Sequence, residues 1–149
     1  MVLAHRAGIV RFAPDSVLAG QGGWRGIKSA AMALDIKICG LSTGPAVEMA
    51  LAGGASHVGF IFFPRSPRNV TPADAAAIAH AARGRAAIVA VSVDAGDDFL
   101  DEMVAHLKPD MLQLHGAETP ERVAQVKRRF CLPAMKAIGV REFIDHFSG

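Results

Sequence analysis

The stretch DIKICGL (residues 35–41) decides the fold of this chain. Branched apolar residues alternate with polar ones in it, which is the pattern of a β-strand. The run ends in Cys39, and Gly40 follows at once, so Cys39 is predicted at the carboxyl end of a strand. In parallel α/β proteins that end is where ligands bind and chemistry takes place. The alternative for Cys39 is a small buried residue that only packs.

Further apolar stretches repeat this arrangement, with polar or charged residues just after the last apolar one. They are HVGFIFF (57–63) before PRSPR, AAIVAVSV (86–93) before DAG, and DMLQL (110–114) before HG. A fifth strand is predicted over residues 133–138. The strands have few polar residues in their middles, as expected for a parallel sheet that is covered on both faces.

Alanine-rich segments between these strands predict helices over residues 45–52, 72–83, 97–107 and 119–130. The second has Thr71 as its N-cap, Pro72 at the first helical position and Gly84 as its stop. Strand and helix therefore alternate with a period of roughly 25 residues, which is typical of right-handed βαβ units around a parallel sheet. The sequence predicts an α/β fold.

Several motifs on these strand ends carry a resemblance. They are KICGL (37–41), GFIF (59–62) with SPR (66–68), QLHG (113–116) and MKAI (135–138). In order and spacing they resemble the phosphoribosylanthranilate isomerase family, whose members act in tryptophan biosynthesis, and the similarity covers about residues 35–138. The resemblance implies a (β/α)8 barrel, the TIM barrel, and a cytoplasmic enzyme.

Barrels of this type take about 250 residues, and the similar part of this chain supplies about five of the eight β/α units. We therefore expect a partial TIM barrel over residues 32–138, and interpret the chain as a truncated gene product, a frameshifted frame or a fragment. Residues 139–149 match nothing that we recognise. The strand with the family's acidic aspartate and the glycine-rich phosphate loops are expected beyond the C-terminus.

Residues 1–31 are expected to be a non-family extension without regular structure. They are basic, contain the single acid Asp15 and show no clear period. A transit peptide fits the arginines, but the glycines at 20–23 oppose the amphipathic helix that it needs. Met32 is then an alternative to Met1 as the natural start.

The composition predicts one domain with a sizeable core, since 51% of the 149 residues are hydrophobic and 20% are charged. A net charge of +2 gives no reason to expect nucleic acid as a partner. No apolar run approaches the roughly 18 residues of a membrane span. Cys39 and Cys131 make no disulfide framework. No CxxC or HExxH motif is present, so no metal is expected.

The resemblance also implies the reaction, an Amadori rearrangement of N-(5′-phosphoribosyl)anthranilate to 1-(2-carboxyphenylamino)-1-deoxyribulose 5-phosphate. It needs an acid at the ring oxygen and a base at C2, and no cofactor is expected because hydrogen moves as a proton. A cysteine can take a proton only as the thiolate. By resemblance, Cys39 is the catalytic base.

The resemblance assigns the substrate-binding residues as well. Arg68 matches the family arginine that contacts the anthranilate carboxylate, a pairing that bidentate geometry favours; Arg65 is interpreted as a solvated loop charge. Gln113 and His115 alternate with leucines along one strand and are predicted to point into the barrel mouth. The alternative for His115 is a packing or capping role. No residue matches the family's acid, and Asp94, which follows the third strand, is not assigned to that role.

Two other interpretations stay open. One is a different barrel isomerase or synthase of phosphorylated sugars, which would use a carboxylate pair or a lysine; the Cys39 motif speaks against it. The other is an inactive barrel fragment. For the family isomerase, and for another barrel isomerase or synthase, the expected partner is a small phosphorylated molecule. The sequence does not fix the oligomeric state.

Overall fold

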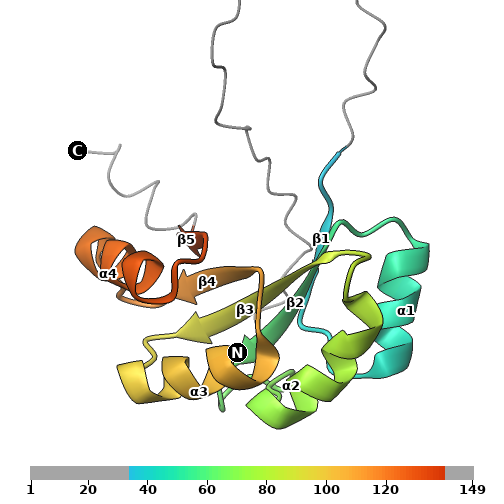
Figure 1. The fold of residues 1–149 in the computed structure, drawn as a ribbon, viewed down its shortest axis with the longest axis horizontal. Coiled ribbons are helices and arrows are strands. Elements are labelled where there is room, and N and C mark those ends of the chain that lie inside the picture. The colour runs from blue at the N-terminus through green and yellow to red at the C-terminus, as the bar shows by residue number, and fades with distance from the viewer. Residues whose placement is uncertain (1–33, 140–149) are drawn as a thin grey trace, which may run out of the picture.

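The computed structural model describes residues 34–139, in which strands and helices alternate along the chain (Figure 1). They are β1 (Lys37–Cys39), α1 (Gly44–Ala52), β2 (His57–Phe62), α2 (Pro72–Ala79), β3 (Ala87–Val93), α3 (Asp97–Leu107), β4 (Met111–His115), α4 (Pro120–Phe130) and β5 (Ala134–Lys136). A short 3-10 helix, η1 (His80–Ala82), extends α2. The predictions for residues 1–31 and 140–149 lie outside the described residues.

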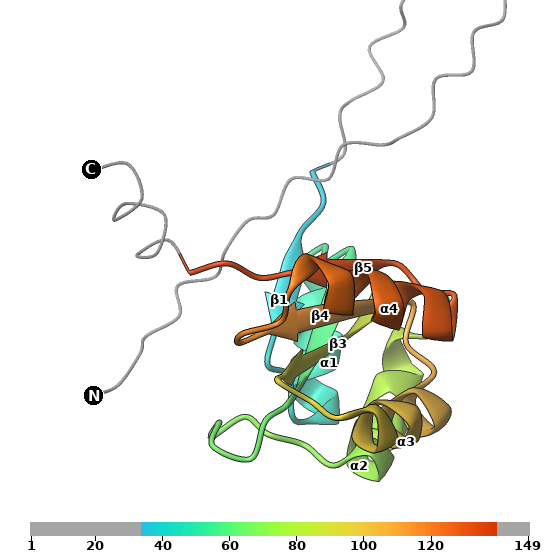
Figure 2. The ribbon, with the colours of Figure 1, turned by 90° about the vertical axis from the view of Figure 1, so that its left-hand side faces the viewer.

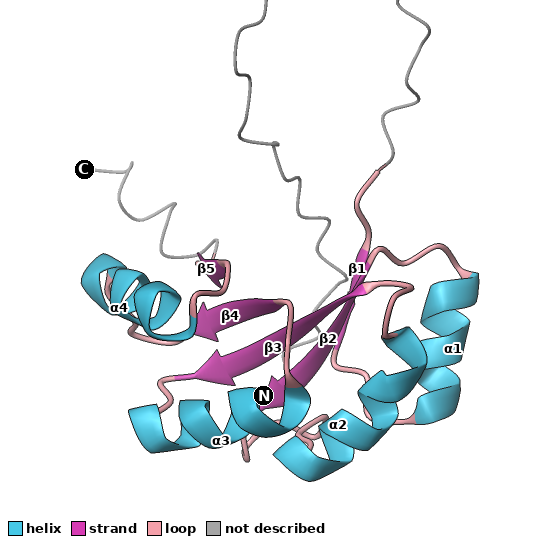
Figure 3. Cartoon of the chain, viewed as in Figure 1, coloured by secondary structure: helices cyan, strands magenta, loops and turns pink. Residues whose placement is uncertain are grey.

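The strands form one sheet in the order β1-β2-β3-β4-β5, and every neighbouring pair is parallel. Figure 3 shows this strand–helix alternation by secondary structure. The prediction of an α/β fold with five parallel strands and four intervening α-helices is confirmed. Within residues 34–139, β1 and β5 are the edges of the sheet. None of the described helices has the length and apolar character that a membrane crossing requires.

Threonine caps explain where three of the helices begin. The hydroxyls of Thr43, Thr71 and Thr119 each accept a hydrogen bond from a backbone N–H in the first turn of α1, α2 and α4, and each helix has a proline in its first positions. The second helix is shorter than predicted. The α-helix ends at Ala79 and continues as the 3-10 helix η1. Gly84, with φ +72°, then changes the direction of the chain.

One face of the sheet holds the hydrophobic core. Register places Phe60 beside Ala90 and Ala90 beside Leu112, so these residues share a face. With their neighbours they are at most 2% exposed, and they pack against the helices. The buried residues of this face are Val58, Phe60, Phe62, Ile88, Ala90, Leu112 and Leu114, and their helical partners include Val47, Ala75, Leu100, Met103, Leu107 and Val126. We call this the helix-covered face.

The opposite face carries every second strand residue, because side chains alternate along a strand. The register Cys39–Gly59–Val89 and the adjoining pair Val91–Gln113 identify it. Among the described residues no helix packs on this side, and the helices form an arc around the other side (Figures 1 and 2). We call it the open face; the predicted site residues of the strands lie on it.

Candidate active site

Cys39 lies half-buried at the carboxyl end of β1, on the open face. It faces Gly59 of β2, and the absence of a side chain there makes room for it. A Cβ on Gly59 would lie 3.1 Å from Cys39 Sγ and 3.2 Å from Lys37 Nζ. The thiol and the ammonium therefore share the space above this glycine. Lys37 is part of the KICGL motif, but that motif alone indicates no role for its ammonium.

Arg68 reaches back from the loop after β2 to Gly40, the residue that follows Cys39. A Cβ on Gly40 would lie 2.8 Å from Arg68 Cδ and 3.0 Å from Nε. Gly40 has φ +81°, and its N–H donates to the Gly59 carbonyl at 2.8 Å. Only glycine both adopts this conformation freely and admits the arginine. The structure thus brings Arg68 against the residue that follows Cys39, whereas Arg65 is exposed.

Gln113 and His115 form a second pair on β4. The two side chains are 2.7 Å apart, from Gln113 Nε2 to His115 Nε2. An amide nitrogen only donates, so the two atoms form this hydrogen bond in the tautomer whose Nε2 carries no proton. Two strands, β2 and β3, lie between β1 and β4, so the pair is three strand spacings from β1, which is roughly 14 Å measured along the sheet. Of the four predicted residues, Gln113 and His115 are in direct contact, whereas Cys39 lies over Gly59 and Arg68 against Gly40.

Sequence reasoning missed a group of charged contacts directly beside His115. Asp94, with φ +47°, donates its backbone N–H to the His115 carbonyl at 3.3 Å. Its Oδ1 accepts the Ala117 N–H at 2.6 Å. Lys136 Nζ donates to the Gly116 carbonyl at 2.5 Å. The signal in the sequence was the position of Asp94 directly after β3. Asp94 was considered there only as a possible acid, and not as a partner of the loop after β4.

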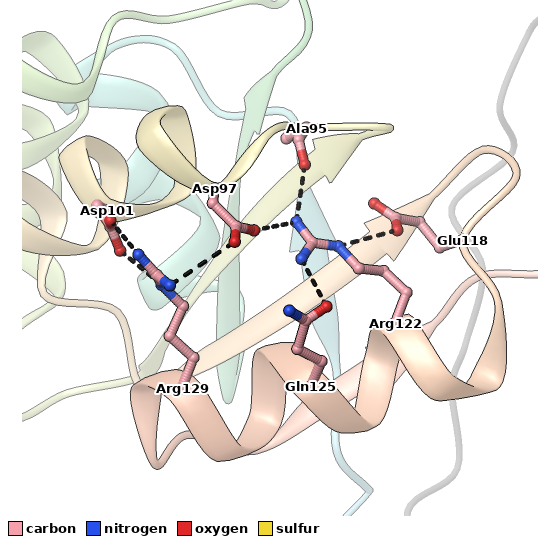
Figure 4. A network of polar contacts seen from close by, with 7 residues as sticks. All are labelled: Ala95, Asp97, Asp101, Glu118, Arg122, Gln125 and Arg129. Carbon is pink, nitrogen blue, oxygen red and sulfur yellow. Dashed lines mark hydrogen bonds and ion pairs between the residues drawn. The ribbon is translucent and has the colours of Figure 1, made fainter.

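Arg122 of α4 connects the loops that follow β3 and β4 (Figure 4). Its guanidinium donates to the Ala95 carbonyl at 3.2 Å and to Gln125 Oε1 at 3.0 Å. It also pairs with Asp97 at 2.5 Å and lies 3.7 Å from Glu118 Oε2. The Glu118 side chain is only 6% exposed, and this burial raises the pKa of its carboxyl, with Arg122 acting in the opposite direction. The network holds the two loops in a fixed relation.

An apolar groove of about 330 Å³ lies elsewhere, between β1 and α1. It is lined by Ile36, Ile38, Ala46, Met49, Ala50, Gly53 and Ala55, and none of the predicted site residues lines it. Ile38 alternates with Cys39 along β1, so the groove is on the helix side of the strand and apart from the thiol. Within residues 34–139 no group of three or more His, Cys, Asp or Glu side chains is arranged to hold a metal ion.

A family model described as N-(5'phosphoribosyl)anthranilate (PRA) isomerase matches residues 36–148 of the chain. The chain belongs to this family. Membership in the phosphoribosylanthranilate isomerase family confirms the resemblance seen in the strand-end motifs. The match begins just after Met32 and continues beyond Ile138; the predicted domain bounds themselves stay a prediction.

Individual relatives are also named as phosphoribosylanthranilate isomerases. The N-(5'-phosphoribosyl)anthranilate isomerase of Rhizobium meliloti (strain 1021) is 63% identical over 114 residues, which are 76% of this chain and 53% of the relative. The crystal structure of phosphoribosyl anthranilate isomerase from Thermus thermophilus is similar with a TM-score of 0.62 and 33% identity, over 68% of this chain and 50% of that one.

A further solved phosphoribosyl anthranilate isomerase is in complex with reduced 1-(o-carboxyphenylamino)-1-deoxyribulose 5-phosphate. It is similar with a TM-score of 0.65 and 26% identity, over 74% of this chain and 57% of that one. The chain spans about half the length of the curated relatives that it matches.

Proposed function

We propose that the chain acts in the isomerisation of N-(5′-phosphoribosyl)anthranilate to 1-(2-carboxyphenylamino)-1-deoxyribulose 5-phosphate, with Cys39 as the base. The observation that carries this proposal is the place of Cys39, on the open face at the carboxyl end of β1. Lys37 shares the space over Gly59 with its thiol, and Arg68 lies against the next residue, Gly40. Family membership and the relative that binds the reduced product support the choice of substrate.

The proposed reaction starts when an acid protonates the ring oxygen as the C1–O bond breaks, which leaves an open-chain protonated imine. The Cys39 thiolate then takes the proton from C2, and the electron pair of that C–H bond neutralises the imine to give the enol-amine. The enol-amine becomes the ketone when its hydroxyl at C2 loses a proton and C1 gains one. The substrate and product have the same atoms, so no oxidant or reductant is consumed. None of the residues 34–139 is assigned as the acid, because none matches the family's acid in the resemblance.

The charges of the site suit this substrate. Its anthranilate carboxylate and its phosphate are both anionic, and a guanidinium binds a carboxylate with two parallel hydrogen bonds. We assign that role to Arg68, which is half-buried over Gly40. Gln113 and His115 are proposed as further polar contacts of the substrate. The expected partner is therefore this small phosphorylated substrate, and the oligomeric state stays open.

A cytoplasmic location is part of the proposal. Both cysteines, Cys39 and Cys131, are free thiols, as a reducing compartment favours. The proposed base also has to stay reduced to act.

The test is growth of a tryptophan auxotroph that lacks this isomerase, together with a direct assay of the purified chain. Growth on the wild-type chain should be lost with Cys39→Ala and kept with Cys131→Ala, the matched control at the exposed end of α4. Loss of one acid–base partner lowers a rate by about 10²–10⁴-fold.

The second candidate is a folded chain without turnover, which the coverage of only about half of each relative favours. Titration with the product separates the two, because a fragment that keeps Arg68, Gln113 and His115 can bind without reacting. No growth and no product binding by a chain that is folded by circular dichroism would overturn the proposal. Growth that survives Cys39→Ala would refute the assignment of the base.

A further inference from the structure

The peptide unit between Gly116 and Ala117 is held at both of its polar ends by opposite charges. The Asp94 carboxylate accepts its N–H at 2.6 Å, and the Lys136 ammonium donates to its carbonyl at 2.5 Å. Asp94 follows β3 and Lys136 ends β5, while the peptide itself follows β4. A single peptide group thus joins the carboxyl ends of three neighbouring strands. We call this arrangement the peptide clamp.

The clamp also fixes the peptide that precedes it. Asp94 donates its own backbone N–H to the His115 carbonyl at 3.3 Å, so one residue holds two successive peptide units. Gly116 is needed between them. It has φ +85°, and a Cβ there would lie 2.2 Å from Asp94 Oδ2. The carboxylate therefore lies flat against a position that only glycine leaves open.

The backbone direction at His115 sets where its imidazole points, because rotamers depend on φ and ψ. His115 in turn bonds Gln113 at 2.7 Å. We propose that Asp94 and Lys136 are positioning residues that set the orientation of His115 and, through it, of Gln113. This inference rests on the proposed function, in which those two side chains contact the substrate.

The two charged hydrogen bonds of the clamp are strong enough to affect the orientation of the Gly116–Ala117 peptide. Hydrogen bonds to charged groups are stronger than neutral ones, and a carboxylate at the N–H and an ammonium at the carbonyl polarise the same peptide in the same sense. Water screens the clamp, since Gly116 and Ala117 are both exposed. We therefore expect a local effect on orientation and exchange and only a small change in global stability.

The experiment compares removal and conservative variants of the full 149-residue chain without ligand. Asp94→Ala and Lys136→Met remove the charged partners, while Asp94→Asn keeps an acceptor and Lys136→Arg keeps a charged donor. Glu102→Gln and Lys127→Met are matched controls, because both residues are exposed on α3 and α4. The readouts are hydrogen exchange of the Ala117 amide and the NMR signals of the His115 ring and the Gln113 side-chain amide.

Asp94→Ala should accelerate exchange of the Ala117 amide by on the order of tenfold. Both removal variants should shift the His115 and Gln113 signals, and each conservative variant should shift the same signals in the same direction but by less. The controls should leave them in place. If Asp94→Ala does not fold, Asp94→Asn carries the test with a smaller change of the same sign. Unchanged His115 and Gln113 signals in the removal variants, or equal shifts in the controls, overturn the proposal.

A kinetic arm separates this inference from the proposed function. In an active chain, removal of the clamp should raise KM more than it lowers kcat, because Cys39 is untouched. If the removal variants change KM and kcat no more than the control variants do, the clamp does not position His115. If the wild-type chain shows neither turnover nor product binding, the proposed function fails, and the NMR readouts still decide whether the clamp orients His115.

Discussion

The two faces of the sheet differ in what they contribute. On the helix-covered face, Phe60, Leu112 and Leu114 are at most 2% exposed and pack among helical side chains. On the open face, Cys39, Gln113 and His115 are half-buried and polar. A single strand such as β4 serves both, because successive residues point to opposite sides. Most of the apolar burial that stabilises the fold is on the helix-covered face. The open face combines buried Val89 and Val91 with polar side chains at its carboxyl end, which are available for chemistry.

Neighbouring residues of β4 give the most direct test of this division. Leu112→Ala should destabilise the chain by about 2–5 kcal/mol, since it removes a fully buried side chain and leaves a cavity. Gln113→Ala, one residue on, should change the free energy of unfolding by less than about 1 kcal/mol and should weaken product binding. Urea denaturation measures the first effect and calorimetric titration the second. Equal losses of stability would show that both faces hold the fold.

Two glycines with positive φ allow a test at the strand ends. Gly84→Ala places a Cβ in open space at φ +72°, so only backbone strain of about 1–2 kcal/mol is expected. Gly116→Ala has the same strain at φ +85° and also pushes the Asp94 carboxylate off the Ala117 N–H. Thermal unfolding should therefore rank Gly116→Ala as the more destabilising. If both variants lower the unfolding temperature equally, the Asp94 carboxylate moves aside at no measurable cost in stability.

Gly59 tests how closely the open face is fitted around Cys39. Gly59→Ala puts a methyl group 3.1 Å from Cys39 Sγ and 3.2 Å from Lys37 Nζ, so both side chains must shift, at a cost of about 1 kcal/mol. The methyl shields the sulfur, and we expect severalfold slower alkylation of Cys39 by iodoacetamide in a Cys131→Ser background. Gly44→Ala, where a Cβ meets nothing within 4 Å, is the control. An unchanged alkylation rate would mean that the thiol has free space elsewhere.

The smallest expected effect concerns Glu118, in the loop between β4 and α4. Burial raises the pKa of its carboxyl above 4.5, so the folded chain binds this proton more tightly than the unfolded chain. Its contribution to stability is then most favourable at acid pH and is lost as the pH rises from 4.5 through the raised pKa. Glu118→Gln should remove that pH dependence. Denaturation of both chains between pH 4 and 8 measures it; parallel curves would contradict the assignment.

Local sequence signals predicted most of the fold. Threonine followed by proline fixed the helix starts at Thr71 and Thr119, and apolar runs gave every strand to within a few residues. The end of α2 at Ala79 was missed. The chain continues there as η1, and Arg83 after it donates to the Lys108 carbonyl at 2.8 Å, a tertiary contact that the local sequence does not reveal. Residue by residue, the motifs placed Cys39 and Arg68 at the correct strand ends.

The contacts that hold the site were not predictable in the same way. The peptide clamp joins Asp94, Gly116 and Lys136, which are far apart in the chain and meet only because β3, β4 and β5 are neighbours. Arg122 likewise meets Asp97 across two loops. Such pairings depend on tertiary distances, whereas periodicity and capping act within one element. The roles proposed for Cys39, Arg68, Gln113 and His115 stay predictions until the variants are measured.

Each strand of the described sheet pairs with the next strand in the chain, and this order has a consequence for synthesis on the ribosome. Contacts between neighbours in sequence close short loops and favour fast folding. Because domains fold as the chain emerges, β2 can pair with β1, and later β3 with β2, before the following unit is translated. The clamp is different, because it needs Lys136 from the last described strand. The core can therefore form early, while the orientation of His115 is fixed only at the end of this sequence of events.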